Sequence, residues 1–236
     1  MFGISTFCLH REPLDTALDT LAAVTDYVEV MDEGLHFLHN PDVLENYSIK
    51  YSVHAPSRGT NLASLLEPIR RASVEVISQC FAVAAEVNAD VIVHPGYFAW
   101  EEERKEAEDQ FRRSREDLLD IADEFSVAFS FENMGNWPYF LLKTPDELSL
   151  LGKCGFALDV GHAHQNHCLD GFLPVKADHY HLHDNNAVED THDPVGAGTI
   201  DFALVMDAVK KSGINPVIEV ASFKGTLQSI TALKKI

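Results

Sequence analysis

Residues 156–164 read F-A-L-D-V-G-H-A-H, residues 179–186 read H-Y-H-L-H-D-N-N, and residues 190–198 read D-T-H-D-P-V-G-A-G. The first two segments begin as strand-like runs, and the three together contain five candidate ligands: Asp159, His162, His181, Asp190 and His192. A mixture of imidazole and carboxylate groups suits Zn²⁺, Mn²⁺ or Fe²⁺ better than Ca²⁺ or Mg²⁺ alone. One His beside one Asp means little, but five such groups in one stretch predict a metal site.

Outside this stretch the chain alternates between short apolar runs and helical patterns. The runs that predict strands are 2–7, 27–31, 51–54, 91–94, 128–132, 156–159, 179–183 and 216–220. The patterns that predict helices are 13–24, 41–47, 62–87, 101–125, 144–151, 169–175, 202–211 and 226–235. Within 62–87, we expect Pro68 to break the helix or to start its main part. Eight alternating units predict an α/β fold, a single (β/α)₈ TIM barrel over residues 1–236. The rival is an open doubly wound sheet, whose usual G-x-G-x-x-G after the first strand is absent here.

Polar side chains lie at or near the carboxyl ends of six different predicted strands. They are His54, His94, Glu132, Asp159, His181 and Glu219. Alternate residues of a barrel strand point inward, so we expect these six to converge on the mouth, where the active sites of this fold lie. Buried carboxylates without compensation are costly, and a divalent cation would supply the missing positive charge. The alternative is a hydrogen-bonded polar core of His–Asp and His–Glu pairs.

Three further residues are candidate ligands on weaker grounds. His162 lies three residues after Asp159 and could face the same cavity from a turn. Asp190 and His192 alternate, so an extended loop would present both on one side, although loop solvation would explain them as well. His183 is a possible partner that orients a ligand.

Composition excludes several classes of protein. The chain has 236 residues, 46% of them hydrophobic, and a formal net charge of −19, which disfavours broad, nonspecific binding to nucleic acid. There is no apolar run of roughly 18 residues, so no membrane span is predicted. None of the four cysteines forms a C-x-x-C pair, and the start of the chain lacks the pattern of a signal peptide. We therefore expect a cytoplasmic protein with reduced thiols, either monomeric or oligomeric.

Short motifs along nearly the whole chain resemble one superfamily. They are G-I-S-T (3–6), V-H-A-P (53–56), V-H-P-G (93–96), F-E-N (131–133), L-D-V-G-H (158–162), H-L-H-D (181–184), D-T-H-D-P-V-G-A-G (190–198) and I-E-V (218–220). The sequence looks like the xylose isomerase-like TIM barrels. These include sugar and sugar-phosphate isomerases and epimerases, and endonuclease IV-type AP endonucleases (AP endonuclease family 2).

The resemblance implies two different ligand sets. The endonuclease IV-like pattern implies a trinuclear zinc site held by nine residues: His54, His94, Glu132, Asp159, His162, His181, Asp190, His192 and Glu219. The isomerase and epimerase branch implies four of them, Glu132, Asp159, His181 and Glu219, around one Mn²⁺-like ion. In that branch Glu132 and Glu219 also act as the catalytic acid–base pair. The cofactor is thus one to three divalent ions, Zn²⁺ or Mn²⁺.

The same resemblance leaves two activities open. One is a metal-dependent isomerase or epimerase that acts on a small sugar or sugar phosphate through an enediolate. The other is a metal-dependent phosphoester hydrolase of the AP endonuclease type. DNA-repair members carry a glutamine–arginine element after the second strand and a tyrosine soon after the first ligand histidine, whereas residues 31–38 here read M-D-E-G-L-H-F-L and residues 55–62 read A-P-S-R-G-T-N-L. A third possibility is a metal-binding scaffold without catalysis.

These missing elements and the acidic charge favour the sugar enzyme and disfavour duplex DNA as a substrate. Three residues outside the ligand set are candidates for substrate binding. Arg58, just after the third strand, could contact a phosphate, and Trp100 and Trp137, after the fourth and fifth strands, could stack on a sugar ring. A solvated loop position explains Arg58 more readily than phosphate binding, and the two tryptophans could simply cap the barrel.

Overall fold

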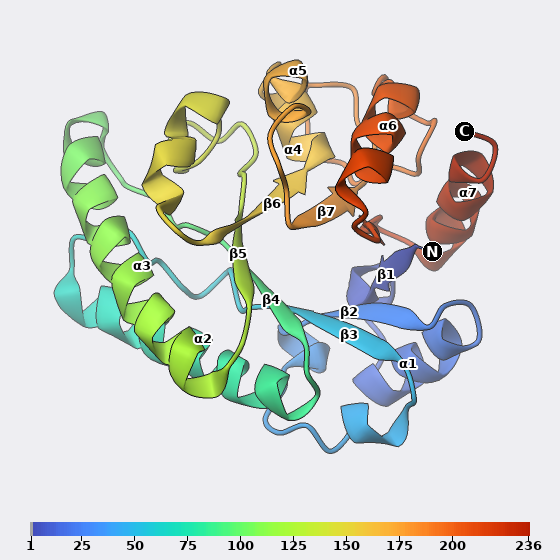
Figure 1. The fold of residues 1–236 in the computed structure, drawn as a ribbon, viewed down its shortest axis with the longest axis horizontal. Helices are drawn as coiled ribbons and strands as arrows, with labels where there is room; N and C mark the ends of the chain where they lie inside the picture. The colour runs from blue at the N-terminus through green and yellow to red at the C-terminus, as the bar shows by residue number, and fades with distance from the viewer. Residues whose placement is uncertain (1) are drawn as a thin grey trace.

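The computed structural model describes residues 2–236, and Met1, with which the predicted domain begins, lies outside them. Eight parallel strands, β1 to β8, form a closed barrel in chain order, and β1 pairs with β8 to close it (Figure 1). The predicted (β/α)₈ TIM barrel is confirmed for the part of the chain described.

The strands agree closely with the predicted runs. They are β1 (Gly3–Ser5), β2 (Tyr27–Met31), β3 (Lys50–His54), β4 (Asp90–Val93), β5 (Phe129–Glu132), β6 (Gly155–Asp159), β7 (His179–Leu182) and β8 (Val217–Ile218). The helices are α1 (Leu14–Ala22), α2 (Glu67–Glu86), α3 (Arg104–Phe125), α4 (Val160–Gln165), α5 (Leu169–Phe172), α6 (Phe202–Ser212) and α7 (Phe223–Leu233). Short 3-10 helices occupy Thr6–Leu9, Gly34–His36, Leu44–Asn46, Glu101–Glu103 and Pro145–Leu151.

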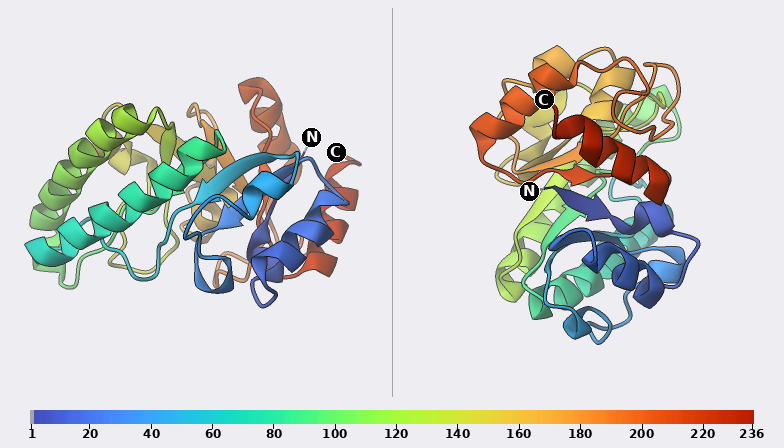
Figure 2. Two further views of the ribbon diagram at one scale, coloured as in Figure 1. Left: turned by 90° about the horizontal axis from the view of Figure 1, so that it is seen from below. Right: turned by 90° about the vertical axis from the view of Figure 1, so that its right-hand side faces the viewer.

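The helices surround the strands, and the long α2 and α3 lie side by side along one flank (Figures 1 and 2). Residues that flank the inward-facing polar positions point outward and are buried in the apolar core against this layer. They are Val53, Val93, Phe131, Leu158, Leu182 and Ile218. The alternation of side chains along each strand therefore separates an apolar outer layer from a polar barrel interior.

Several helical segments differ from the prediction. Residues 41–47 contain only a short 3-10 helix, Leu44–Asn46. Pro68 lies in the first turn of α2, which begins at Glu67, so Pro68 starts the main part of the helix as expected and residues 62–66 are not helical. Residues 145–151 form a 3-10 helix in which Thr144 and Glu147 make a capping box. The sequence did not predict α4, whose first turn is stabilised by a hydrogen bond from the His162 amide to the Asp159 carboxylate.

The classes of protein excluded by composition can be compared with the structure. Among residues 2–236, no helix combines the length and apolarity needed to cross a membrane. All four cysteines are free thiols. Burial raises the pKa of Cys8 to about 11, so this thiol is protonated at neutral pH.

Candidate metal centre

The nine predicted ligands come together at the carboxyl ends of the strands. They form three groups, and within each group one ligand atom per residue lies within 4.8 Å of the others. The first group is His54, His94 and Glu132; the second is Glu132, Asp159, His181 and Glu219; the third is His162, Asp190 and His192, together with His183. Together these groups contain all nine residues implied by the endonuclease IV-like pattern, with one histidine added.

Glu132 lies between the first and second groups and faces each with a different oxygen. Its Oε2 is 3.2 Å from His54 Nε2 and 3.0 Å from His94 Nε2. Its Oε1 is 3.1 Å from His181 Nδ1. His54 Nδ1 donates a hydrogen bond of 3.0 Å to the backbone carbonyl of Ala55. This bond orients the ring and leaves Nε2 for the ligand group. This placement suits a carboxylate that bridges two ions.

The second group is the most deeply buried. Asp159 and His181, register partners on β6 and β7, are both fully buried. His181 Nδ1 lies 3.8 Å from Asp159 Oδ2 and 3.6 Å from Glu219 Oε2. Three carboxylates thus converge on one imidazole nitrogen, an arrangement that requires compensating positive charge.

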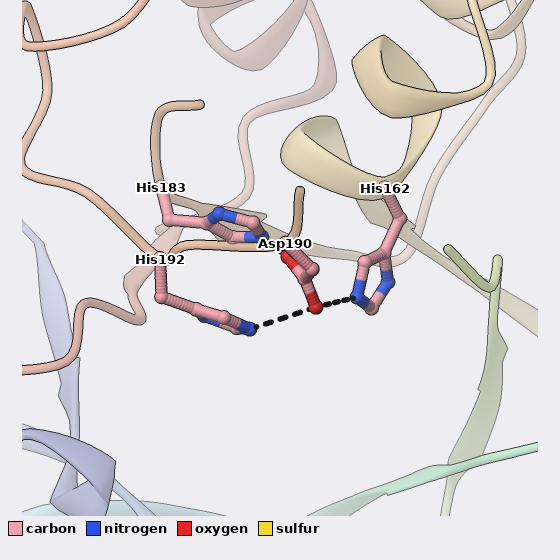
Figure 3. A group of neighbouring side chains, drawn as sticks. All are labelled: His162, His183, Asp190 and His192. Atoms are coloured by element: carbon pink, nitrogen blue, oxygen red, sulfur yellow. Dashed lines mark hydrogen bonds and ion pairs between the residues drawn. The ribbon is translucent and has the colours of Figure 1, made fainter. Parts of the chain in front are cut away.

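The third group is built by α4 and the loop after β7. Asp190 lies between two imidazoles, with Oδ2 3.1 Å from His162 Nε2 and 3.3 Å from His192 Nε2 (Figure 3). The other ring nitrogens are held by backbone carbonyls: His162 Nδ1 by Asn133 and His192 Nδ1 by Glu219, both at 2.9 Å. Both Nε2 atoms are therefore directed toward Asp190.

His183, predicted as a partner that orients a ligand, has two contacts of interest. Its Nε2 is 3.0 Å from Asp159 Oδ1, which agrees with that prediction. Its ring also stacks on His192 at 3.9 Å between centroids and belongs to the third group (Figure 3). Gly161 permits this position, because a Cβ there would lie 2.0 Å from His183 Cε1. In the sequence, the signal for the place of His183 was the alternation H-Y-H-L-H (179–183), which puts three histidines on one side of β7.

When no cation is bound, protonated histidines balance the negative charge of the carboxylates in the centre. Burial opposes ionisation of Glu132, but His181 and His94 outweigh it and hold its pKa well below the usual value. Burial likewise opposes protonation of His54, but Glu132 raises its pKa to about 9. The residues fit a divalent ion well, because five histidines and four carboxylates, at strand ends and on the segments that follow them, form the mixed donor set that Zn²⁺ and Mn²⁺ prefer.

A cavity of about 640 Å³ opens above the centre. Seven of the nine predicted ligands line it, and Asp159 and His181 lie buried beneath. Arg58 and Trp137, two of the three candidates for substrate binding, also line it. Trp100 does not: its side chain is 65% exposed and lies outside the cavity lining. The structure adds an aromatic wall that the sequence did not indicate, in which Tyr97 and Phe140 pack edge-on against Trp137.

Comparison with known proteins places this centre in a family. Residues 42–236 match the family described as xylose isomerase-like TIM barrel. An uncharacterized protein of Methanocaldococcus jannaschii is 34% identical over 227 residues, which cover 92% of this chain and 90% of that protein. A probable endonuclease 4 of Mycobacterium leprae is 28% identical over 250 residues, which cover 93% of this chain and 96% of that protein.

Among solved structures, a D-tagatose 3-epimerase-like protein superimposes with a TM-score of 0.91 at 29% identity, over 99% of this chain and 96% of that one. Family, relatives and structure agree over most of the sequence. The chain therefore belongs to the xylose isomerase-like TIM barrel family.

Proposed function

We propose that this protein is a divalent-metal-dependent epimerase or isomerase of a small sugar. The main support is the placement of two carboxylates, Glu132 and Glu219. Both belong to the second ligand group and both line the same cavity. The cavity of about 640 Å³ is within the range of small-molecule sites. The similarity to a D-tagatose 3-epimerase-like protein at 29% identity agrees with this proposal.

The two carboxylates can move a proton on and off carbon. A divalent ion at the second group would polarise the substrate carbonyl and stabilise the negative charge that develops on its oxygen. Glu132 is ionised, because the histidines around it outweigh its burial and lower its pKa, so it can accept the proton from the adjacent carbon. Glu219, protonated from solvent before the step, would give that proton to the opposite face of the carbon and so invert its configuration. Exchange with solvent would then remove the proton from Glu132 and restore the one on Glu219.

The cavity lining favours a neutral substrate over a polyanion. Among the lining residues that the structure describes, Arg58 is the one Lys or Arg side chain, and it is 78% exposed and paired with Glu33 at 3.3 Å. Phe7, Tyr97 and Trp137 supply apolar surface suited to the faces of a sugar. One exposed guanidinium could contact a single phosphate, but a nucleic-acid backbone would meet a protein of net charge −19.

A second candidate is a phosphoester hydrolase, favoured by the complete third group. Proton transfer at carbon requires one ion, whereas His162, Asp190 and His192 provide for a further one. The probable endonuclease 4 of Mycobacterium leprae, 28% identical, points to the same chemistry. Against it stand the acidic charge and the absence of the DNA-inserting residues.

The first test combines metal content with hydrogen exchange at carbon. Protein loaded with Mn²⁺ or Zn²⁺ is incubated with a panel of ketoses and ketose phosphates in D₂O and followed by proton NMR. We expect deuterium at the inverted carbon of a substrate, with exchange stopped by a chelator and restored by metal. Hydrolysis of phosphodiesters, close to three zinc ions per chain, and no exchange with any ketose would contradict the proposal.

Replacing His192 by Asn separates the two candidates. Asn removes Nε2 but retains a donor for the Glu219 carbonyl, and it tolerates the positive φ of 46° at this position. We expect sugar turnover to stay within about twofold, since the second group is intact. A hydrolase that uses the third group should instead lose about 100-fold or more. The control is His164→Asn, which alters a histidine bonded to Thr199 outside the ligand groups.

Replacing Trp137 by Ala tests the aromatic wall. Loss of a stacking contact worth roughly 0.5–1.5 kcal/mol should raise KM for the sugar up to about tenfold with little change in kcat. Steady-state kinetics with the substrate identified above provide the measurement. Trp100→Ala is the matched control, because Trp100 lies outside the cavity lining. Equal effects of the two substitutions would show that the wall does not contact substrate.

A further inference from the structure

Glu29 is a fully buried carboxylate beneath the metal centre that the proposed chemistry does not use. It lies in the middle of β2, between the outward-facing Val28 and Val30, and its side chain points into the barrel. Burying an ionised carboxylate is costly unless every oxygen is hydrogen-bonded. Its contacts therefore indicate its role.

Glu29 accepts hydrogen bonds through both oxygens. Its Oε1 lies 2.7 Å from His181 Nε2, and its Oε2 accepts from Ser52 Oγ at 2.8 Å. Ser52 in turn accepts from the Tyr27 hydroxyl at 3.0 Å. The order of donors is fixed, because Tyr27 donates to Ser52 and the Ser52 proton is then directed at Glu29. Together these three residues form a relay that ends on one ring nitrogen of His181.

Close packing holds the start of this relay in place. A Cβ on Gly3 would lie 2.6 Å from Tyr27 Cδ1, so the absence of a side chain at Gly3 leaves room for the phenol ring. A second imidazole nitrogen, His179 Nε2, lies 3.0 Å from Glu29 Oε2, at ion-pair distance but outside hydrogen-bond geometry. The imidazole hydrogen bond to Glu29 in good geometry is the one from His181.

The relay decides which nitrogen of His181 faces the ligand group. A carboxylate can only accept, so His181 Nε2 must carry a proton. Its Nδ1 is bonded to Glu132 Oε1 at 3.1 Å and faces Glu219 Oε2 at 3.6 Å, so without a cation this nitrogen carries a proton as well. A cation at the second group would displace the Nδ1 proton, while Glu29 retains the one on Nε2. Outer carboxylates of this kind fix the tautomer and ring orientation of metal-binding histidines and raise their basicity.

We propose that Glu29 is a positioning residue that holds His181 with Nε2 protonated and presents Nδ1 to a divalent cation at the second group. The role rests on the proposed metal site but not on the reaction catalysed there. A purely structural role for the relay would stabilise the barrel without any preference between the two nitrogens of His181.

Nitrogen NMR of protein with ¹⁵N-labelled histidine tests the proposal in the wild type. We expect a slowly exchanging proton on His181 Nε2 both without metal and with Zn²⁺ bound, and zinc coordination through Nδ1. Coordination through Nε2, or an Nε2 without a proton, would overturn it. If the wild type binds no zinc, the proposed function fails, yet the Nε2 proton of the metal-free protein still decides whether the relay exists.

Glu29→Gln tests the consequence for metal binding. With Ser52 donating to the amide oxygen, the amide nitrogen would donate to His181 Nε2 and move the ring proton to Nδ1, where it blocks the cation. We expect the Kd for Zn²⁺, measured by chelator competition, to rise about 10- to 100-fold. An unchanged Kd in a folded variant would overturn the proposal.

The control is Glu147→Gln, which alters a carboxylate that accepts backbone amide hydrogen bonds in the capping box, outside the barrel interior, and should leave the Kd unchanged. If Glu29→Gln does not fold, Tyr27→Phe serves instead, since it removes only the hydroxyl that orients Ser52. A smaller rise in Kd in the same direction is expected there. An unchanged Kd for Zn²⁺ in Tyr27→Phe, together with a rapidly exchanging proton on His181 Nε2, would contradict the relay.

Discussion

Sugar turnover is expected to disappear when Glu132 and Glu219 are both replaced by Gln. Each proton-transferring group contributes roughly 10²- to 10⁴-fold to such a reaction, so the loss of both should bring the rate to the detection limit. Glu132 also contacts two candidate ligand groups, and its replacement leaves His54 and His94 without their carboxylate partner. Proton exchange at carbon in D₂O is the most sensitive measurement, because it detects half-reactions that do not complete the inversion.

The single substitutions show how the two roles divide. Glu219→Gln should retain metal at the first group, which does not contain Glu219, whereas Glu132→Gln should lose metal from two groups. Elemental analysis and circular dichroism of each variant separate loss of metal or fold from loss of the acid–base pair. Turnover retained by the folded double variant would show that these carboxylates are not the catalytic pair.

Metal affinity is expected to rise steeply with pH and to be accompanied by proton release. Burial opposes protonation of His54 and His192, but neighbouring Glu132 and Asp190 outweigh it and raise the pKa of each histidine to about 9. Both rings are therefore protonated at pH 7 in the metal-free protein, and a cation must displace those protons. Calorimetry in two buffers of different ionisation enthalpy should show release of about two protons or more when all groups fill at pH 7, and fewer as the pH rises through about 9 and His54 and His192 become neutral before metal binds.

The metal-free protein should show the opposite dependence on pH. The folded pKa of His54 and His192 lies above the unfolded value of about 6.5, so their contribution to the free energy of unfolding is complete below pH 6.5. That contribution is lost as the pH rises through about 9. Chemical denaturation between pH 6 and pH 10, with and without Zn²⁺, provides the measurement. In the metal-binding experiment, a Kd for Zn²⁺ that does not change with pH would show that His54 and His192 are neutral before metal binds.

Strand ends were predictable because alternation along a strand is a strong local constraint. His54, Glu132 and Asp159 each end an apolar run, and closure of the barrel brings such ends together whatever the helices do. Strand ends alone could not predict the third ligand group, since Asp190 and His192 lie on a loop. Their meeting with His162 depends on α4, which begins where Asp159 caps it and which apolar periodicity did not indicate.

Contacts between residues far apart in the chain could not be predicted from local sequence patterns. Glu29 is a charged residue inside the apolar run 27–31, and that anomaly was the available signal, but its partner His181 is 152 positions away. Trp100 and Trp137 both follow strand ends, yet Trp137 faces the cavity and Trp100 faces solvent. The difference depends on how the two loops pack together, including a bridge between Tyr97 and Phe140, and no local pattern encodes it.

Glu132 presents one oxygen to each of two ligand groups, and this has a consequence for how they would fill. Histidines already hold both oxygens of this buried carboxylate, so Glu132 is ordered by folding and not by either ion. It would be pre-organised for both ions, and repulsion between two dications so close together would make the second bind more weakly than the first. By thermodynamic reciprocity, whichever ion binds first would change the affinity for the other by the same factor in either order.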